Sequence, residues 1–146
     1  MEIAHLEPDW AGERARGTQI GLEYELLYEL DGTLLRVEVV GAAARTIELG
    51  DADFFDLGLS PLFNSLPVLR DGLLAAGPAR DYVMTWVDVP SLTATRAEQR
   101  YTPLGGRVVR YASSGFTAEI EFDAEGFVLH YPGLARRVVA MHENPR

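Results

Sequence analysis

The chain has 146 residues, of which 47% are hydrophobic, and its formal net charge at pH 7 is −9. A chain of this length and apolar content fits a single domain with a sizeable core, which excludes disorder of the whole chain. The acidic balance argues against a nucleic-acid partner, and the absence of cysteine from the sequence excludes disulfides, thiolate nucleophiles and cysteine-based metal sites.

The first ten residues predict no targeting segment. They carry Glu2, Glu7 and Asp9 and no basic residue, which is the wrong charge for a signal peptide. No stretch of the sequence approaches the roughly 20 apolar residues of a membrane span. We therefore expect no transmembrane segment and a cytoplasmic location.

The N-terminal part divides into two regions. Residues 1–17 are polar without a clear period, so we expect an N-terminal arm or a weak first strand, followed by a single β domain over residues 18–146. Residues 18–30 alternate with period two, which predicts a strand with one buried and one wet face. The apolar face carries Tyr24, Leu26, Tyr28 and Leu30, and the acidic face carries Glu23, Glu25 and Glu29.

A hairpin follows this strand. Asp31-Gly32 is a dipeptide that tolerates the positive φ of a type I′ turn. The return strand is expected over Leu34–Val40, with Leu35, Val37 and Val39 on one face, and a third strand over Arg45–Leu49.

The middle of the chain predicts a short helical or irregular segment near residues 60–76. Ser60 and Pro61 favour a helix start, whereas Pro67 limits the helix to at most a turn between residues 60 and 66. Residues 62–76 are too apolar for an exposed loop, so we expect them to pack against the sheet as a plug or crossover.

The second half reads as a meander of short strands separated by Gly, Pro and Ser turns. Turns recur about every ten residues, which is typical of a sandwich, barrel or half-barrel. The expected strands cover residues 82–89, 92–101, 108–111, 116–122, 127–131 and 134–141. In the strand over 116–122, the even-numbered residues are apolar and the odd-numbered ones polar or acidic.

The sequence offers no catalytic constellation. His5, His130 and His142 stand at no metal-ligand spacing, and no G-x-S-x-G motif occurs. Acidic pairs such as Glu119/Glu121 lie two residues apart on an alternating strand, which is typical of a solvated face rather than of a glycosidase. We expect no cofactor, no bound metal and no enzymatic activity.

Aromatic residues dominate the expected inner faces of the strands. They form either an ordinary β core or the wall of a cavity. Buried tyrosine and tryptophan need partners for their O–H and N–H groups, which suits a pocket with polar handles.

Three segments resemble the bacterial putative glycolipid-binding family, formerly a domain of unknown function. Ser60-Pro61-Leu62-Phe63-Asn64-Ser65-Leu66-Pro67 resembles "sP-x-x-N-x-LP". Trp86-Val87-Asp88-Val89-Pro90-Ser91-Leu92 with Glu98-Gln99-Arg100-Tyr101 resembles "W-V-x-x-P-x-L…EQ-x-Y". Phe116-Thr117-Ala118 with Asp123, Gly126, Val128, Tyr131-Pro132-Gly133-Leu134 and Arg136-Arg137 resembles "F-x-A…D-x-x-G-x-V-x-x-YPGL-x-RR". The match covers roughly residues 55–139, and residues 1–50 match loosely.

The resemblance implies a mainly β fold, with a single antiparallel, strongly curved sheet or half-barrel meander similar to lipoprotein carriers. It also implies a glycolipid or other amphipathic small molecule as ligand, held on the concave face. The residues expected to bind it are Tyr24, Tyr28, Asn64, Trp86, Gln99, Tyr101 and Tyr131.

Other interpretations remain open at this stage. Asn64 could instead bond the turn backbone, and Gln99 could satisfy backbone groups beneath residues 60–67. The domain could be a structural or protein-interaction module with a solid core, and it could form a homo-oligomer. A cavity holding a carboxylate with Arg100 or His130 in hydrogen-bond reach would favour an enzyme.

Overall fold

In a computed structural model, which describes residues 4–5, 9–11, 14–20, 24–133 and 135–136, the described part of the chain forms two sheets and one helix. The first sheet has the order β1-β3-β4-β5-β6, with β2 beside β3, and all its pairs are antiparallel. Its strands are β1 (Ala4–His5), β2 (Asp9–Ala11), β3 (Arg14–Ile20), β4 (Glu25–Asp31), β5 (Leu34–Val39) and β6 (Ala43–Glu48).

The second sheet has the order β13-β12-β11-β10-β9-β8-β7. Helix α1 (Leu62–Asp71) lies between β7 and β8 in the chain. The strands are β7 (Phe54–Leu57), β8 (Arg80–Val87), β9 (Ala94–Gly105), β10 (Val108–Ser113), β11 (Phe116–Phe122), β12 (Val128–Tyr131) and β13 (Ala135–Arg136).

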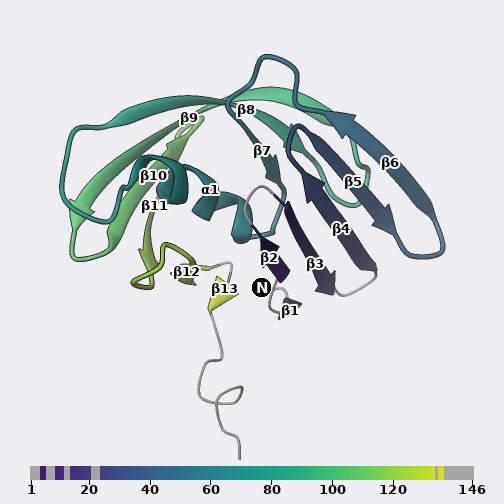
Figure 1. The fold of residues 1–146 in the computed structure, drawn as a ribbon, viewed down its shortest axis with the longest axis horizontal. Coiled ribbons are helices and arrows are strands. Elements are labelled where there is room, and N and C mark those ends of the chain that lie inside the picture. Colours follow the sequence, from purple (N-terminus) through teal and green to yellow (C-terminus); the bar gives the residue numbers. More distant parts are fainter. Residues whose placement is uncertain (1–3, 6–8, 12–13, 21–23, 134, 137–146) are drawn as a thin grey trace, which may run out of the picture.

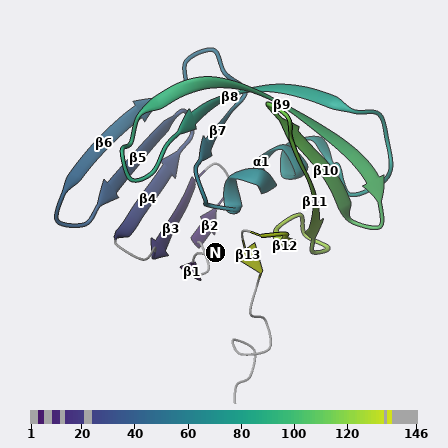
Figure 2. The ribbon, with the colours of Figure 1, turned by 180° about the vertical axis from the view of Figure 1, so that it is seen from behind.

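The two sheets form the two sides of an arch, with α1 beneath it (Figure 1). The long strands β8 and β9 cross the top of the arch, as the view from behind also shows (Figure 2). The concave side of the second sheet therefore faces α1 rather than open solvent.

The hairpin of β4 and β5 follows the predicted alternation. Leu26, Tyr28 and Leu30 are buried, whereas the residues between them are exposed. Asp31 pairs with Leu34, so the two-residue turn is Gly32-Thr33, one residue later than the sequence pattern placed it. The apolar face packs inward because only that face is covered by the rest of the chain.

The prediction of one antiparallel sheet is wrong in two respects. The strands divide between two sheets, and the 18–30 segment belongs to two strands of the first sheet, with residues 18–20 in β3 and Glu25–Asp31 forming β4. In addition, β7 pairs with β8 in parallel. A parallel pair requires a long crossover connection, and residues 58–79, including α1, provide it.

Helix α1 is longer than predicted and continues through Pro67 to Asp71. The helix begins directly after Ser60-Pro61, as the sequence indicated, with Pro61 at the N-cap position and no side-chain hydrogen bond from that residue. Instead, the N–H of Phe63 donates to the Ser60 carbonyl. Proline removes one backbone hydrogen bond, but burial of Leu62–Val68 supplies the apolar packing that holds the helix together.

Helix α1 connects two apolar cores. Its first turns join the core of the first sheet, where the Phe63 ring lies edge-on to Tyr28 at 5.3 Å between centroids. Val68, further along the helix, joins the core of the second sheet. That second core contains Val68, Leu73, Tyr82, Met84, Tyr101, Val109, Tyr111, Ile120, Phe122 and Tyr131.

The C-terminal strands agree with the predicted meander apart from local details. In β11, Ile120 and Phe122 are buried, but Phe116 is 50% exposed because it lies opposite Ser113 at the end of the hairpin. A bulge between Glu121 and Phe122 shifts the register toward β12. The last strand was expected over residues 134–141; β13 covers Ala135–Arg136, and the rest lies outside the described residues.

Candidate functional site

Two adjoining hollows lie on the second sheet, and both are lined by Trp86 and Tyr111. The larger has a volume of about 680 Å³ and the smaller about 300 Å³. The larger is also lined by Thr95, Arg96, Ala97, Glu98, Gln99, Ser113 and Ser114. The smaller is also lined by Asp56, Leu57, Gly58, Leu59, Ser60, Asn64, Asp88, Val89 and Tyr131.

The larger hollow arises from unequal strand lengths. Strand β9 pairs with β8 over residues 94–101, but its pairing with β10 covers only residues 100–105. Strand β10 ends at Ser113, whose hydroxyl donates to the carbonyl of Glu98 over 3.1 Å. Residues 95–99 therefore have β8 on one side and the hollow on the other.

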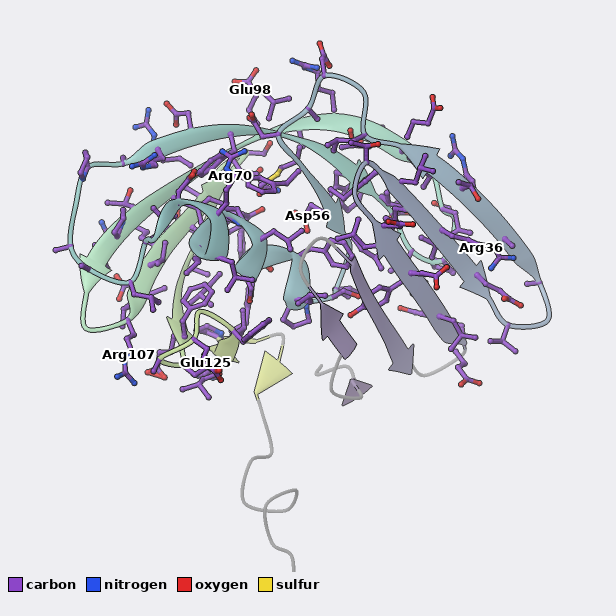
Figure 3. The ribbon with its side chains drawn as sticks, in the orientation of Figure 1. Arg36, Asp56, Arg70, Glu98, Arg107 and Glu125 are labelled. Carbon is purple, nitrogen blue, oxygen red and sulfur yellow. The ribbon has the colours of Figure 1, made fainter. Side chains whose placement is uncertain are left out.

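A buried polar pair stands where the two hollows approach each other. Asp56 on β7 and Gln99 on β9 are 8% and 3% exposed, and Gln99 Nε2 donates to Asp56 Oδ2 over 2.6 Å. Figure 3 shows Asp56 in the interior between α1 and the strands, whereas Arg36, Arg107 and Glu125 lie at the margins. Burial raises the pKa of Asp56 to about 6, although the Gln99 hydrogen bond opposes the rise.

The other polar atom of Gln99 has no partner among the residues that the structure describes. Gln99 Oε1 is buried and accepts no hydrogen bond from the described residues. Buried acceptors are nearly always satisfied in native structures, and an unfilled one costs free energy. The buried part of the site is therefore polar, and it contains one hydrogen-bond acceptor that a donor on a ligand could satisfy.

A row of aromatic rings continues from this pair across the second sheet. Tyr101 lies edge-on between Tyr82 and Tyr111, with 5.5 Å between centroids on each side, and Tyr131 is 6.4 Å from Tyr111. Burial raises the pKa of Tyr101, Tyr111 and Tyr131, and the Asp56 carboxylate contributes to each rise. These three phenols thus share the electrostatic environment of Asp56.

Helix α1 is tied to this row by one buried hydrogen bond. Asn64 Nδ2 donates to the hydroxyl of Tyr101 over 3.1 Å. Asn64 thus bonds a side chain on β9, so the interpretation that it serves the turn backbone is wrong. Gln99 likewise bonds the Asp56 carboxylate rather than backbone groups beneath the helix.

The structure brings five of the seven residues predicted from the sequence to one region. Asn64, Trp86, Gln99 and Tyr131 line a hollow, and Tyr101 is fully buried beside them. Of the other two, Tyr28 is buried in the core that the first sheet mainly forms, and Tyr24 packs against that core. Whether any of the seven contacts a ligand stays a prediction.

Sequence reasoning missed Asp56 and Tyr111. Asp56 stands in the short apolar run Phe54–Leu57, where an acid is unusual, and this was the available indication. The strand itself escaped notice because it has four residues and its parallel partner follows much later in the chain. Tyr111 was placed on a strand, but its position beside Trp86 depends on the curvature of the sheet.

The charged residues considered for catalysis lie elsewhere. Arg100 is paired with Asp81 in an exposed, bidentate contact, and His130 Nδ1 is 3.9 Å from Glu121. Neither residue lines either of the two hollows described above. Among the described residues no group of three His, Asp or Glu side chains could hold a metal ion. Within the same residues, no helix has the length and apolar character required to span a bilayer.

The arrangement combines flat aromatic walls with a few convergent polar atoms. Trp86 and Tyr111 contribute aromatic rings to the lining, Leu59 and Val89 contribute aliphatic surface, and Asp56 and Gln99 contribute acceptors. Ligand pockets for small organic molecules combine apolar and aromatic walls with a few polar groups, which the smaller hollow matches more closely than the larger one.

Comparisons with known proteins agree with this architecture. A family model described as putative glycolipid-binding matches residues 37–137. The solved structure of a DUF1089 family protein from Pseudomonas aeruginosa superposes with a TM-score of 0.77 at 23% sequence identity, covering 94% of this chain and 93% of the other. A search of curated proteins finds no match.

Proposed function

This chain belongs to the putative glycolipid-binding family, and we propose that it binds an amphipathic, glycolipid-like molecule at the two hollows of its second sheet without catalysing a reaction. One observation carries the proposal: a buried carboxylate–amide pair with an unfilled acceptor stands beside hollows walled by tryptophan and tyrosine. The family match supports the ligand class.

Each half of an amphipathic ligand finds a suitable surface. Leu59, which is 41% exposed, and the partly exposed Val89 line the smaller hollow. Apolar surface of this kind favours an acyl chain at about 25 cal/mol per Å² removed from water. The ring faces of Trp86 and Tyr111 suit the C–H face of a sugar, and the buried acceptors suit its hydroxyls.

A binding role also explains why a costly polar group is retained. An ionised carboxylate in the interior is unfavourable unless it is well paired, and a buried acceptor without a donor adds to the cost. A hydroxyl-bearing ligand supplies the missing hydrogen bonds. The partner of Asp56 is an amide, which neither takes up nor delivers a proton at neutral pH, and this favours binding over acid–base catalysis.

The alternative is a structural or protein-interaction module with a solid core. That alternative requires a filled concave face, and hollows of about 680 and 300 Å³ count against it. Nucleic acid is not proposed as a partner, since the net charge is −9.

Native mass spectrometry tests the proposed function. The protein is purified without detergent, sprayed directly, and then titrated with a panel of glycolipids and fatty acids. We expect retained lipid or one-to-one adducts that decrease when Trp86 is replaced by leucine. Leu27→Ala, on the exposed outer face of β4, is the matched control and should leave the adducts unchanged. Adducts absent for every lipid would overturn the proposal.

A further inference from the structure

We propose that the polar end of this site receives an uncharged, hydroxyl-bearing headgroup and rejects anionic headgroups, through the Gln99 amide oxygen and the Asp56 carboxylate. The inference rests on the proposed function, which it narrows from glycolipid-like molecules in general to those with an uncharged headgroup. Three features of the described residues carry it.

The first feature is the pair of acceptors. Gln99 lines the larger hollow and Asp56 lines the smaller one. Because Gln99 Nε2 donates to Asp56, the amide is oriented with its oxygen directed away from Asp56. That oxygen is buried and has no partner in the described part of the chain. A ligand that completes the site must therefore donate hydrogen bonds, and hydroxyl groups do so.

The second feature is the sign of the nearby charges. Among the described residues that line the smaller hollow, the charged ones are Asp56 and Asp88. The larger hollow is lined by Glu98 and by Arg96, whose guanidinium Nη1 is already 2.8 Å from Asp51. A phosphate or sulfate would meet carboxylates of its own sign in a partly desolvated site, and no lining cation in the described part of the chain is left unpaired.

The third feature is the set of phenols around Asp56. Tyr111 and Tyr131 line the smaller hollow, and Tyr101 is held beside them by Asn64. Phenol hydroxyls both donate and accept, so they pair with sugar hydroxyls in either direction. Their rings also provide flat apolar faces, which a pyranose covers and a compact phosphate does not.

Calorimetric titration with amphiphiles that share a twelve-carbon chain tests the inference. The titrants are dodecyl maltoside, dodecyl phosphate and dodecyltrimethylammonium, each below its critical micelle concentration, together with free maltose. At pH 8 Asp56 is ionised, since its pKa is about 6. We expect dodecyl maltoside to bind roughly tenfold or more tightly than either charged amphiphile. Maltose alone should bind more weakly than dodecyl maltoside, because it lacks the alkyl chain. If maltose binds as tightly as dodecyl maltoside, the site is one for free sugars, and the inference of a lipid headgroup is overturned.

The remaining outcomes separate the inference from the function on which it rests. Equal affinity for dodecyl phosphate would overturn the headgroup inference while leaving amphiphile binding intact. Equal affinity for dodecyltrimethylammonium, which has no hydrogen-bond donor, would show that hydroxyl donation does not decide selectivity and would also overturn it. If none of the amphiphiles binds, the proposed function fails as well.

Two variants locate the selectivity. Asp56→Asn keeps the side-chain shape and removes the charge, so the preference for maltoside over phosphate should fall roughly tenfold. Gln99→Leu removes the free acceptor, so maltoside affinity should fall while dodecyl phosphate binding changes little. Asp81→Asn is the charge-matched control, because Asp81 is an exposed carboxylate on β8 that is paired with Arg100 on β9. This variant should leave the preference for maltoside over phosphate unchanged. An unaltered preference in folded Asp56→Asn protein would contradict the assignment.

Discussion

Gln99 Nε2 donates a hydrogen bond to Asp56 Oδ2 over 2.6 Å, across strands that are separated by β8 in the second sheet. The two residues lie 43 positions apart in the chain. Strand β7 pairs with β8 and β8 with β9, so the two side chains reach each other across the strand between them.

The stability of the free protein should fall as the pH rises from about 4 to about 6. The pKa of Asp56 in the folded state is about 6, above the ordinary value of 3.8, so the folded protein holds this proton more tightly than the unfolded chain. The contribution is fully present below about pH 4 and is lost as the pH rises through about 6; its full size is about 3 kcal/mol. Urea denaturation between pH 4 and pH 8 measures it.

Asp56→Asn should remove this contribution to the pH dependence and stabilise the protein at pH 8. The asparagine oxygen still accepts from Gln99, and no charge is buried. Asp81→Asn provides the comparison, since Asp81 is exposed and its pKa is lowered by the Arg100 hydrogen bonds. If Asp56→Asn loses stability at pH 8 relative to wild type, ionised Asp56 is not the unfavourable group that the structure indicates.

The Asn64–Tyr101 bond should couple helix α1 to the second sheet. Tyr101→Phe leaves the buried Asn64 amide without its acceptor, which should cost about 1–3 kcal/mol of unfolding free energy. Adding Asn64→Leu removes the other partner as well, so the double variant should lose less than the sum of the two single losses. Denaturation midpoints of the four proteins form the cycle, and strict additivity would mean that the bond contributes nothing.

Trp86→Leu should separate binding from stability. Trp86 is partly exposed and lines both hollows, so its loss should weaken dodecyl maltoside binding roughly tenfold or more, with a small change in stability. Met84→Ala, two residues earlier on the same face of β8, should do the reverse. Met84 is fully buried, and its truncation should cost about 2–5 kcal/mol. Calorimetric titration with thermal denaturation of each variant distinguishes the two residues, and equal binding losses would contradict the assignment of Trp86.

The sequence predicted strands well wherever one face is buried and the other wet. Leu26, Tyr28 and Leu30 alternate with exposed residues as expected, because period-two patterning reports burial directly. The same reasoning failed at β7, where burial on both sides of a four-residue strand removes the alternation. It also failed at Pro67, because tertiary packing of α1 outweighs the local cost of proline.

The candidate site could be predicted only in part for a related reason. Asn64, Trp86, Gln99, Tyr101 and Tyr131 came from motifs and strand faces. Tyr24 and Tyr28 satisfy the same aromatic criterion but pack in the other core, since a sequence does not state which sheet a strand joins. Asp56 stood out only as an acid in a short apolar run, and its contact with Gln99 could not be predicted without the parallel crossover.

Fluorescence quenching by a maltoside with a brominated alkyl chain tests the central claim most directly. The protein contains two tryptophans, Trp10 and Trp86. The variant Trp10→Phe therefore leaves Trp86 as the single indole, and its fluorescence reports on the hollows. Bromine quenches an indole only at close contact. Our account predicts saturable, one-to-one quenching of Trp86 below the critical micelle concentration, reversed by unlabelled dodecyl maltoside. Trp86 emission that stays constant while the amphiphile binds elsewhere, or does not bind, would contradict it.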